Sequence, residues 1–244
     1  MCYVAAMISA GRWIVHLRAH LVIARQGSDV EGIHQIRVAS RRLDTWLVLG
    51  NLRVLRDDLR WLRASVSAAR DLDVLAASDV PVEVAAWLRQ RRGAEQNAVV
   101  AATGSRRTAA LADALALLPD LDAKTARRSI ARILRQVLRR GARLDPDAIV
   151  DTHLHALRRS VRRLRFAIEW TGDRCSRLAE LQETFGEFNN NALLVRWLDS
   201  FPEPALVSEL RTRLDAALRR QRMAVVGTWN ATKSEMEALC RTWN

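Results

Sequence analysis

The stretch IHQIRVASRRL, residues 33–43, places one histidine and three arginines close together in a segment with helical character. His34, Arg37 and Arg41 are separated by three and then four positions, so on an α-helix they share one face. At about 100° per residue, the large apolar side chains of Ile36 and Leu43 fall on the opposite side. Arginine forks beside a titratable imidazole are suited to holding a phosphate-rich anion.

The same pattern occurs a second time, in LHALRRSVRRLRF, residues 154–166. Residues 158–165 contain five arginines and no acid. Aligning the two copies gives two sets of candidate anion ligands, which are His34, Arg37, Arg41 and Arg42 in the first and His155, Arg158, Arg159, Arg162, Arg163 and Arg165 in the second.

The alternative interpretation of each stripe is an ordinary solvated helix face. Such a face normally interleaves acids with arginines, because like charges at helical spacing destabilise a helix by a few tenths of a kcal/mol per pair. The absence of acids therefore favours an anion site. Since Arg37 and Arg158 lie opposite the apolar face, we expect truncation of either not to open the core.

The segments that follow the two stripes also resemble each other. Residues 59–75 align with residues 178–194, which places Arg70 and Asp71 against Asn189 and Asn190 as supporting residues. Asp71, and less so Asp73, could orient a neighbouring arginine, although helix capping explains them equally well. The asparagines could donate hydrogen bonds to a phosphate or satisfy the local backbone.

The composition points the same way. The chain of 244 residues has a formal net charge of +12, and among 39 basic residues only two are lysines, Lys124 and Lys233. This favours a polyanionic partner such as nucleic acid, polyphosphate or an anionic membrane, although arginine-rich codon usage would also lower the lysine count. Three widely spaced cysteines indicate a reduced, cytosolic protein, and we identify neither a signal peptide nor a transmembrane segment.

Strand signals are nearly absent, so we predict an all-α fold. The expected helices cover residues 3–26, 29–50, 54–77, 81–103, 105–118, 122–141, 146–171, 174–199 and 203–228. The repeated motifs indicate an internally duplicated unit, with a first repeat at about 3–118, a second at about 122–228 and a C-terminal tail at 229–244.

At these motifs the sequence resembles the CHAD family, the conserved histidine α-helical domain, over about residues 8–228. The resemblance implies a single CHAD domain over residues 1–244, made of two antiparallel helical bundles related by pseudo-two-fold symmetry, with a basic groove or pore between them. It implies binding of inorganic polyphosphate and association with polyphosphate granules. The sequence departs from the family pattern at Arg162, where lysine is usual, and after Asn189, where Asn190 replaces an aspartate.

We therefore expect a non-catalytic polyphosphate-binding protein that needs no cofactor or metal and no membrane. Two alternatives stay open, which are binding of RNA or single-stranded DNA and, less favoured, an enzyme that processes polyphosphate. Phosphate-loop, zinc-protease and nucleophile-elbow motifs are all missing from the sequence. The pair His16 and His20 has chelating spacing but no Asp, Glu or Cys ligand at matching spacing, so we expect a surface or packing role. The oligomeric state is left open.

Overall fold

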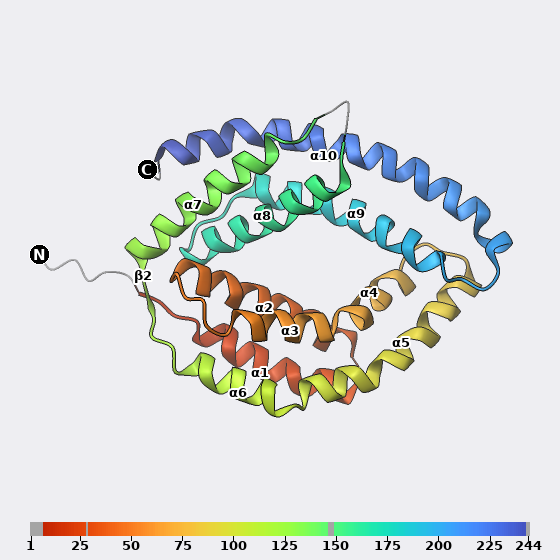
Figure 1. Ribbon diagram of the computed structural model, residues 1–244, viewed down its shortest axis with the longest axis horizontal. Helices are drawn as coiled ribbons and strands as arrows, with labels where there is room; N and C mark the ends of the chain where they lie inside the picture. The colour runs from red at the N-terminus through yellow and green to blue at the C-terminus, as the bar shows by residue number, and fades with distance from the viewer. Residues whose placement is uncertain (1–6, 28, 146–148, 243–244) are drawn as a thin grey trace, which may run out of the picture. The chain divides into compact units, whose positions relative to one another are not determined.

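The computed structural model describes residues 7–27, 29–145 and 149–242, with side chains up to residue 240, and almost all of these residues are helical (Figure 1). The predicted all-α class is confirmed. The chain divides into two compact units, Met1–Asp122 (unit 1) and Ala123–Asn244 (unit 2). Of the helices described, none combines the length and the apolar character that a membrane crossing requires.

Unit 1 is a cluster of helices closed by one short strand pair. Its elements, in chain order, are β1 (Met7–Ile8), α1 (Gly11–Gln26), α2 (Val30–Leu49), α3 (Arg56–Ser65), α4 (Ser67–Ala76), α5 (Val82–Thr103), α6 (Arg106–Ala116) and β2 (Leu121–Asp122). The two strands pair antiparallel, with Ile8 opposite Leu121, and the indole of Trp46 donates to the carbonyl of Ile8 at 3.0 Å. These strands were not expected, because two residues are too few to leave an alternating pattern.

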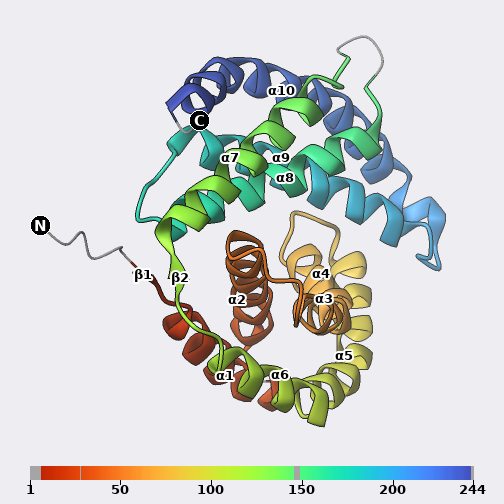
Figure 2. The same cartoon turned by 60° about the vertical axis from the view of Figure 1, so that its left-hand side comes forward.

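Helix α2, which carries the first stripe, is held tightly against α1 (Figure 2). Its first turn is capped by Asp29, whose carboxylate accepts from the backbone N–H of Glu31 at 2.7 Å. At Gly32 the two helices approach so closely that a Cβ atom would lie 2.7 Å from the backbone nitrogen of Ala24. The packing of α1 therefore fixes the rotation of α2 and the direction in which its stripe points.

The single helix expected over residues 54–77 is wrong, because the chain forms two helices that meet at Val66. Serines flank this residue, and each returns its hydroxyl to a carbonyl four residues earlier: Ser65 to Trp61 at 3.0 Å and Ser67 to Arg63 at 2.8 Å. Such bonds compete with the backbone ladder and bend helices. The bend gives α4 a direction of its own, and α4 packs against α2.

Unit 2 consists of four helices, within the residues described, and one 3-10 turn. Its elements are α7 (Ala123–Gly141), α8 (Asp151–Trp170), α9 (Ser176–Leu198), η1 (Pro204–Val207) and α10 (Ser208–Thr242). The helix that carries the second stripe was expected from residue 146, but residues 146–148 lie outside those described and α8 begins at Asp151.

The end of the chain differs from the expectation. Residues 229–242 are not a separate tail but continue α10 as one helix. Trp229 is 2% exposed and Met236 is fully buried, so this part of the helix belongs to the core of unit 2. Trp229 packs against Gly141 so closely that a Cβ atom at the glycine would lie 1.8 Å from the indole ring. The few large apolar residues after residue 228 are separated by polar ones, so the sequence did not indicate that this segment packs in the core.

Candidate anion-binding site

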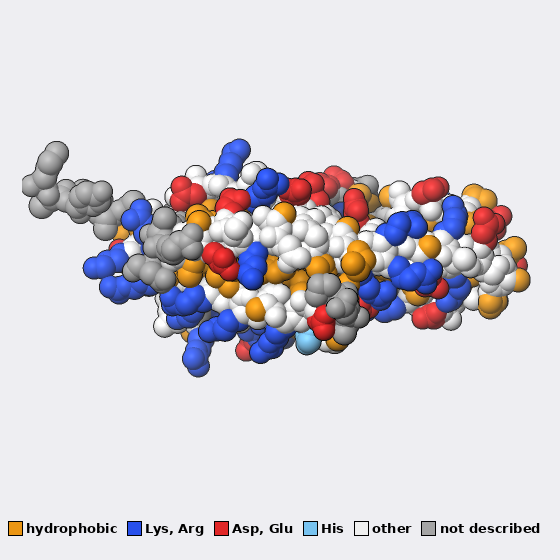
Figure 3. Space-filling model, turned by 90° about the horizontal axis from the view of Figure 1, so that it is seen from above, with side chains coloured by type: hydrophobic (Ala, Val, Ile, Leu, Met, Phe, Trp, Pro, Cys, Tyr) orange, Lys and Arg blue, Asp and Glu red, His pale blue; other side chains and the backbone are white. Residues whose placement is uncertain are grey.

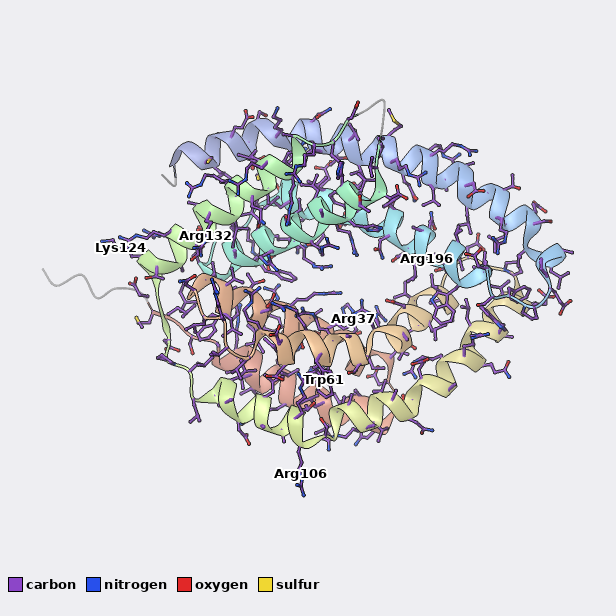
Figure 4. All side chains as sticks on the ribbon, viewed as in Figure 1. Arg37, Trp61, Arg106, Lys124, Arg132 and Arg196 are labelled. Atoms are coloured by element: carbon purple, nitrogen blue, oxygen red, sulfur yellow. The ribbon has the colours of Figure 1, made fainter. Side chains whose placement is uncertain are left out.

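The first stripe is not a solvated helix face. His34, Arg37 and Arg41 are all half-buried, because α4 packs against this side of α2. Arg37, labelled in Figure 4, donates through one nitrogen to the carbonyl of Ser67 at 3.1 Å and to the carboxylate of Asp71 at 2.9 Å. Its side chain is 16% exposed and that of Asp71 is 30% exposed. Truncation of Arg37 therefore removes contacts between two helices, which the helical wheel did not predict.

The two aspartates of α4 have different partners. Asp71, the one favoured from the sequence, lies on Arg37 as just described. Asp73 is 4% exposed and accepts from the guanidinium of Arg92 in α5 at 2.7 Å. Arg92 also donates to the side-chain oxygen of Gln96 at 3.1 Å, and the amide nitrogen of Gln96 donates to the carbonyl of Ala24 at 3.1 Å. Both carboxylates lie within a helix and hold arginines in place, so neither is a helix-end cap.

Arg70 stands out among the supporting residues. It is half-buried on α4, and within the described part of the chain its side chain makes neither a hydrogen bond nor an ion pair. Burial lowers the pKa of Arg70, and the charge of Arg37 lowers it further against the opposing effects of Asp73, Glu31 and Asp71. The guanidinium stays charged at any working pH, so its donors are available to an anion.

His34 shares this surrounding. Burial lowers the pKa of His34 below its ordinary value of 6.5, and the charges of Arg70, Arg41 and Arg37 lower it further, while Glu31 opposes them. The imidazole is therefore neutral at neutral pH in the free protein. A bound anion would reverse part of this effect, because a negative charge favours the protonated ring.

The remaining candidate of α2 points elsewhere. The guanidinium of Arg42 lies over the ring of Trp13 in α1, 4.5 Å from its centroid.

The pair His16 and His20 lies on α1, with ring centroids 4.1 Å apart. Nε2 of His16 donates to Gln35 at 2.8 Å, and Nδ1 of His20 donates to the carbonyl of His16 at 2.8 Å. His16 therefore joins α1 to α2, while His20 bonds within α1, in keeping with the surface or packing role expected from the sequence.

In unit 2, α8 presents its candidates with different degrees of exposure. Arg159 is exposed, whereas the others are half-buried, namely His155, Arg158, Arg162, Arg163 and Arg165. Arg165 is engaged by Glu169, one turn later, at 2.8 Å. The charge of Arg165 is therefore partly neutralised within α8.

His155 is the counterpart of His34 in its electrostatics. Burial lowers its pKa, and Arg158, Arg196 and Arg159 lower it further against the effect of Asp151. Its ring lies 6.0 Å from that of Phe188 in α9. Like His34, it is neutral in the free protein and surrounded by positive charge.

Two arginines that the sequence did not assign belong to this surrounding. Arg140 of α7 donates to the carbonyl of Ala156 at 3.3 Å and to the hydroxyl of Ser160. Arg196 of α9, labelled in Figure 4, lies near enough to His155 to affect its pKa. A signal for Arg196 was present, since it follows Asn189 by seven positions and so shares its helix face.

The asparagines lie in the middle of α9 rather than at a turn. Asn189 is half-buried and Asn190 is exposed, while the neighbouring Asn191 donates to Gln221 of α10 at 3.1 Å.

The N-terminal end of α8 is fixed to α10 by a bidentate ion pair, in which Arg222 donates to both oxygens of Asp151 at 2.8 and 2.9 Å. The hydrogen bonds from Arg222 lower the pKa of Asp151, so this carboxylate is held in its charged form.

Comparison with known proteins identifies the fold. No curated protein matches the chain. Among solved structures, the crystal structure of the CHAD domain from the plant Ricinus communis shares 24% sequence identity and a TM-score of 0.66, covering 96% of this chain and 88% of the other. PptA from Streptomyces chartreusis shares 17% identity and a TM-score of 0.59, covering 94% and 99%. Residues 10–199 match the CHAD domain family, which includes both arginine stripes, and the chain therefore belongs to this family.

Proposed function

We propose that the protein binds inorganic polyphosphate without catalysis, through the faces that α2 and α8 present. Arg70 carries this proposal, because its side chain is a half-buried cation that makes neither a hydrogen bond nor an ion pair within the described residues, beside His34 and Arg37. Burying a charge without a partner is costly, so such a group is best explained by an anion that completes it.

The chemistry of the two faces favours phosphate over other anions. Arginine presents a planar fork of donors that matches phosphate oxygens, and several forks at helical spacing match a ligand with repeating charges. The neutral histidines add donors that gain a proton when the anion arrives. The nearby carboxylates hold arginines, as Asp71 holds Arg37 and Asp151 holds Arg222, so we assign them positioning and not catalytic roles.

A nucleic acid would be attracted by the same charge. Proteins that bind single strands interleave aromatic side chains with basic ones and stack bases on them. Here the ring beside His155 belongs to Phe188, which is 1% exposed, and the indole beneath Arg42 is covered by that guanidinium. Neither ring offers a free stacking surface, which supports polyphosphate as the preferred polyanion.

The decisive experiment titrates long-chain polyphosphate and single-stranded RNA against the protein at matched salt. We expect tighter binding of polyphosphate and a linear fall of log affinity with log salt, with a slope of about 0.7–0.9 per phosphate contact. Equal affinity for RNA would favour the nucleic-acid alternative. Release of orthophosphate during the titration would favour the enzyme alternative.

A single substitution tests the role of Arg70. Arg70→Gln should weaken polyphosphate binding while the melting temperature stays the same or rises, because a half-buried charge is removed and neither a hydrogen bond nor an ion pair is lost. Arg106, exposed on α6 and labelled in Figure 4, provides the matched control, and Arg106→Gln should leave the affinity within about twofold. Unchanged affinity of the Arg70 variant would remove this residue, and the face it belongs to, from the proposal.

Stoichiometry tells whether the two faces act on one polyphosphate chain. If they do, Arg41→Ala and Arg162→Ala each weaken binding, and the double variant loses at least the sum of both effects. If each face binds separately, a single variant halves the stoichiometry at unchanged affinity. Calorimetry with a defined short polyphosphate distinguishes the two outcomes.

A further inference from the structure

Helix α7 has an arginine-rich outer face that the proposed function does not use. Residues 123–144 contain eight basic residues and no acid; they are Lys124, Arg127, Arg128, Arg132, Arg135, Arg139, Arg140 and Arg143. No other helix that the structure describes has so many basic residues in a run without a carboxylate. Such a run is unusual for a helix face that only contacts solvent.

Six of these residues form one stripe, which we call the α7 stripe and which consists of Lys124, Arg128, Arg132, Arg135, Arg139 and Arg143. Their spacing of three or four positions keeps them within about 100° of the helix circumference. All six are exposed, whereas Ile130, Ile133 and Val137 on the opposite side are buried. α7 ends at Gly141 and a hydrogen-bonded turn carries the chain to Arg143, so the stripe is about 28 Å long at roughly 1.5 Å per residue.

The side chains of the α7 stripe are poorly neutralised. Among the residues described, Lys124, Arg128, Arg139 and Arg143 form no ion pair. In unit 1, by contrast, two exposed arginines pair with acids from neighbouring helices, Arg18 with Asp113 and Arg107 with Asp58. Figure 4 shows Lys124 projecting away from α7, and on the face seen in Figure 3 Lys and Arg side chains gather at the lower left and again towards the right.

The α7 stripe meets the face of α8 at its C-terminal end. Arg140 bridges the two helices through its bonds to Ala156 and Ser160. The pKa of Arg140 is lowered by burial and then by the charges of Arg159 and Arg143. Arg143, the last residue of the stripe, and Arg159 of α8 therefore both lie close enough to Arg140 to repel it, and positive charge runs without interruption from α7 to α8.

Two other partners fit this surface less well. A membrane-bound helix inserts a free apolar face into the bilayer, but the apolar face of α7 is buried in unit 2. A reader of single-stranded nucleic acid needs aromatic side chains, and residues 123–144 contain none. A regular row of cations spaced about 6 Å apart instead matches a flexible, unbranched anion whose charges repeat along its length.

We propose that the α7 stripe is a second track for polyphosphate, which extends the α8 face and makes the affinity of unit 2 grow with chain length. This inference rests on the proposed function. Tripolyphosphate is too short to follow both surfaces, so it reports on the α8 face alone. Long-chain polyphosphate reaches the α7 stripe and gains additional arginine contacts there.

The test removes three charges from the stripe with Arg128→Gln, Arg132→Gln and Arg139→Gln combined. All three side chains are exposed and glutamine is a good helix former, so the fold should be preserved. At about 0.15 M salt, three lost contacts should weaken long-chain polyphosphate about 50-fold and lower the salt slope by about 2. Affinity for tripolyphosphate should stay within about twofold of the unmodified protein.

The matched control removes the same charge from α10 of the same unit. Arg213, Arg219 and Arg220 are exposed and lie outside the stripe, so the triple glutamine variant should lose much less affinity for long-chain polyphosphate. Equal losses in both triple variants would mean that only net charge matters, and this would overturn the second track. An α7 triple variant that keeps its affinity for long-chain polyphosphate would also overturn the second track. Duplex RNA serves as a second probe, and a variant that loses affinity for duplex RNA but not for polyphosphate would overturn it as well.

The proposed function can fail separately from this inference. If the unmodified protein binds neither tripolyphosphate nor long-chain polyphosphate, the proposed function is wrong and the second track with it. If the unmodified protein binds long-chain polyphosphate and Arg158→Gln weakens that binding, while the α7 triple variant does not, only the second track is wrong.

Discussion

The contact between Arg37 and α4 can be tested by replacing Arg37 with alanine. The substitution removes a hydrogen bond to the carbonyl of Ser67 and an ion pair with Asp71. Exposed ion pairs contribute at most about 1 kcal/mol, and breaking a fully buried one costs about 3–5 kcal/mol. With side chains 16% and 30% exposed, this pair lies between the two cases, and we expect a loss of about 2 kcal/mol in the free energy of unfolding.

This free energy translates into a shift of the melting temperature. Unfolding entropies of about 2.1 cal/mol/K per residue predict a decrease of about 8 °C if unit 1, with 122 residues, unfolds on its own. The decrease is about 4 °C if the whole chain of 244 residues unfolds in one transition. Thermal unfolding followed by circular dichroism, together with urea titration, measures both quantities.

The control for Arg37 is Arg60→Ala, the same chemical change in an exposed pair. Arg60 is 53% exposed and its partner Asp57 is 84% exposed, so we expect a loss below about 0.5 kcal/mol. If Arg37→Ala shifts the melting temperature no more than this control, then α4 does not hold Arg37 in solution. The stripe would then be the ordinary solvated helix face, which was the alternative interpretation of the sequence.

Two further predictions concern packing and protonation. Gly141→Ala should destabilise unit 2 by about 3 kcal/mol, because the added Cβ would overlap the Trp229 ring. The control Gly227→Ala should be neutral or stabilising, because no atom lies within 4 Å of the added Cβ. Equal melting temperatures of the two variants would refute this prediction. Because His34 and His155 have a lowered pKa in the free protein, polyphosphate binding should take up protons and tighten as the pH falls from about 8 to 6. Calorimetry in buffers of different ionisation enthalpy measures the uptake, and a pH-independent affinity without proton uptake would contradict it.

The sequence was informative where periodicity alone decides the structure. The apolar residues of α2 and α8 recur at helical spacing, so the helices and their arginine stripes could be predicted from the sequence. The break at Val66 could not be predicted, because it depends on whether two serine hydroxyls bond to the backbone or to solvent. The extension of α10 was missed since its apolar contacts are made with Gly141 of another helix, which no local pattern reveals.

The site shows the same division. Helical spacing identified His34 and Arg37 as neighbours, and the repeat alignment indicated Asp71 as a supporting residue. Spacing within one helix could not show that α4 covers Arg37 or that the side chain of Arg70 makes neither a hydrogen bond nor an ion pair within the described residues, since both depend on how α4 packs against α2. The internal duplication and a basic groove between the repeats stay predictions.

The strand pair of unit 1 has a consequence for how the two halves can be studied. Because β1 and β2 pair, the chain enters and leaves unit 1 at neighbouring points, with Met7 opposite Asp122. A unit with adjacent ends can be cut out or circularly permuted without stretching its backbone. A fragment that ends at Asp122 keeps both strands and the indole bond from Trp46 to Ile8. The contribution of His34, Arg37 and Arg70 to anion binding can thus be measured in isolation from the arginines of unit 2.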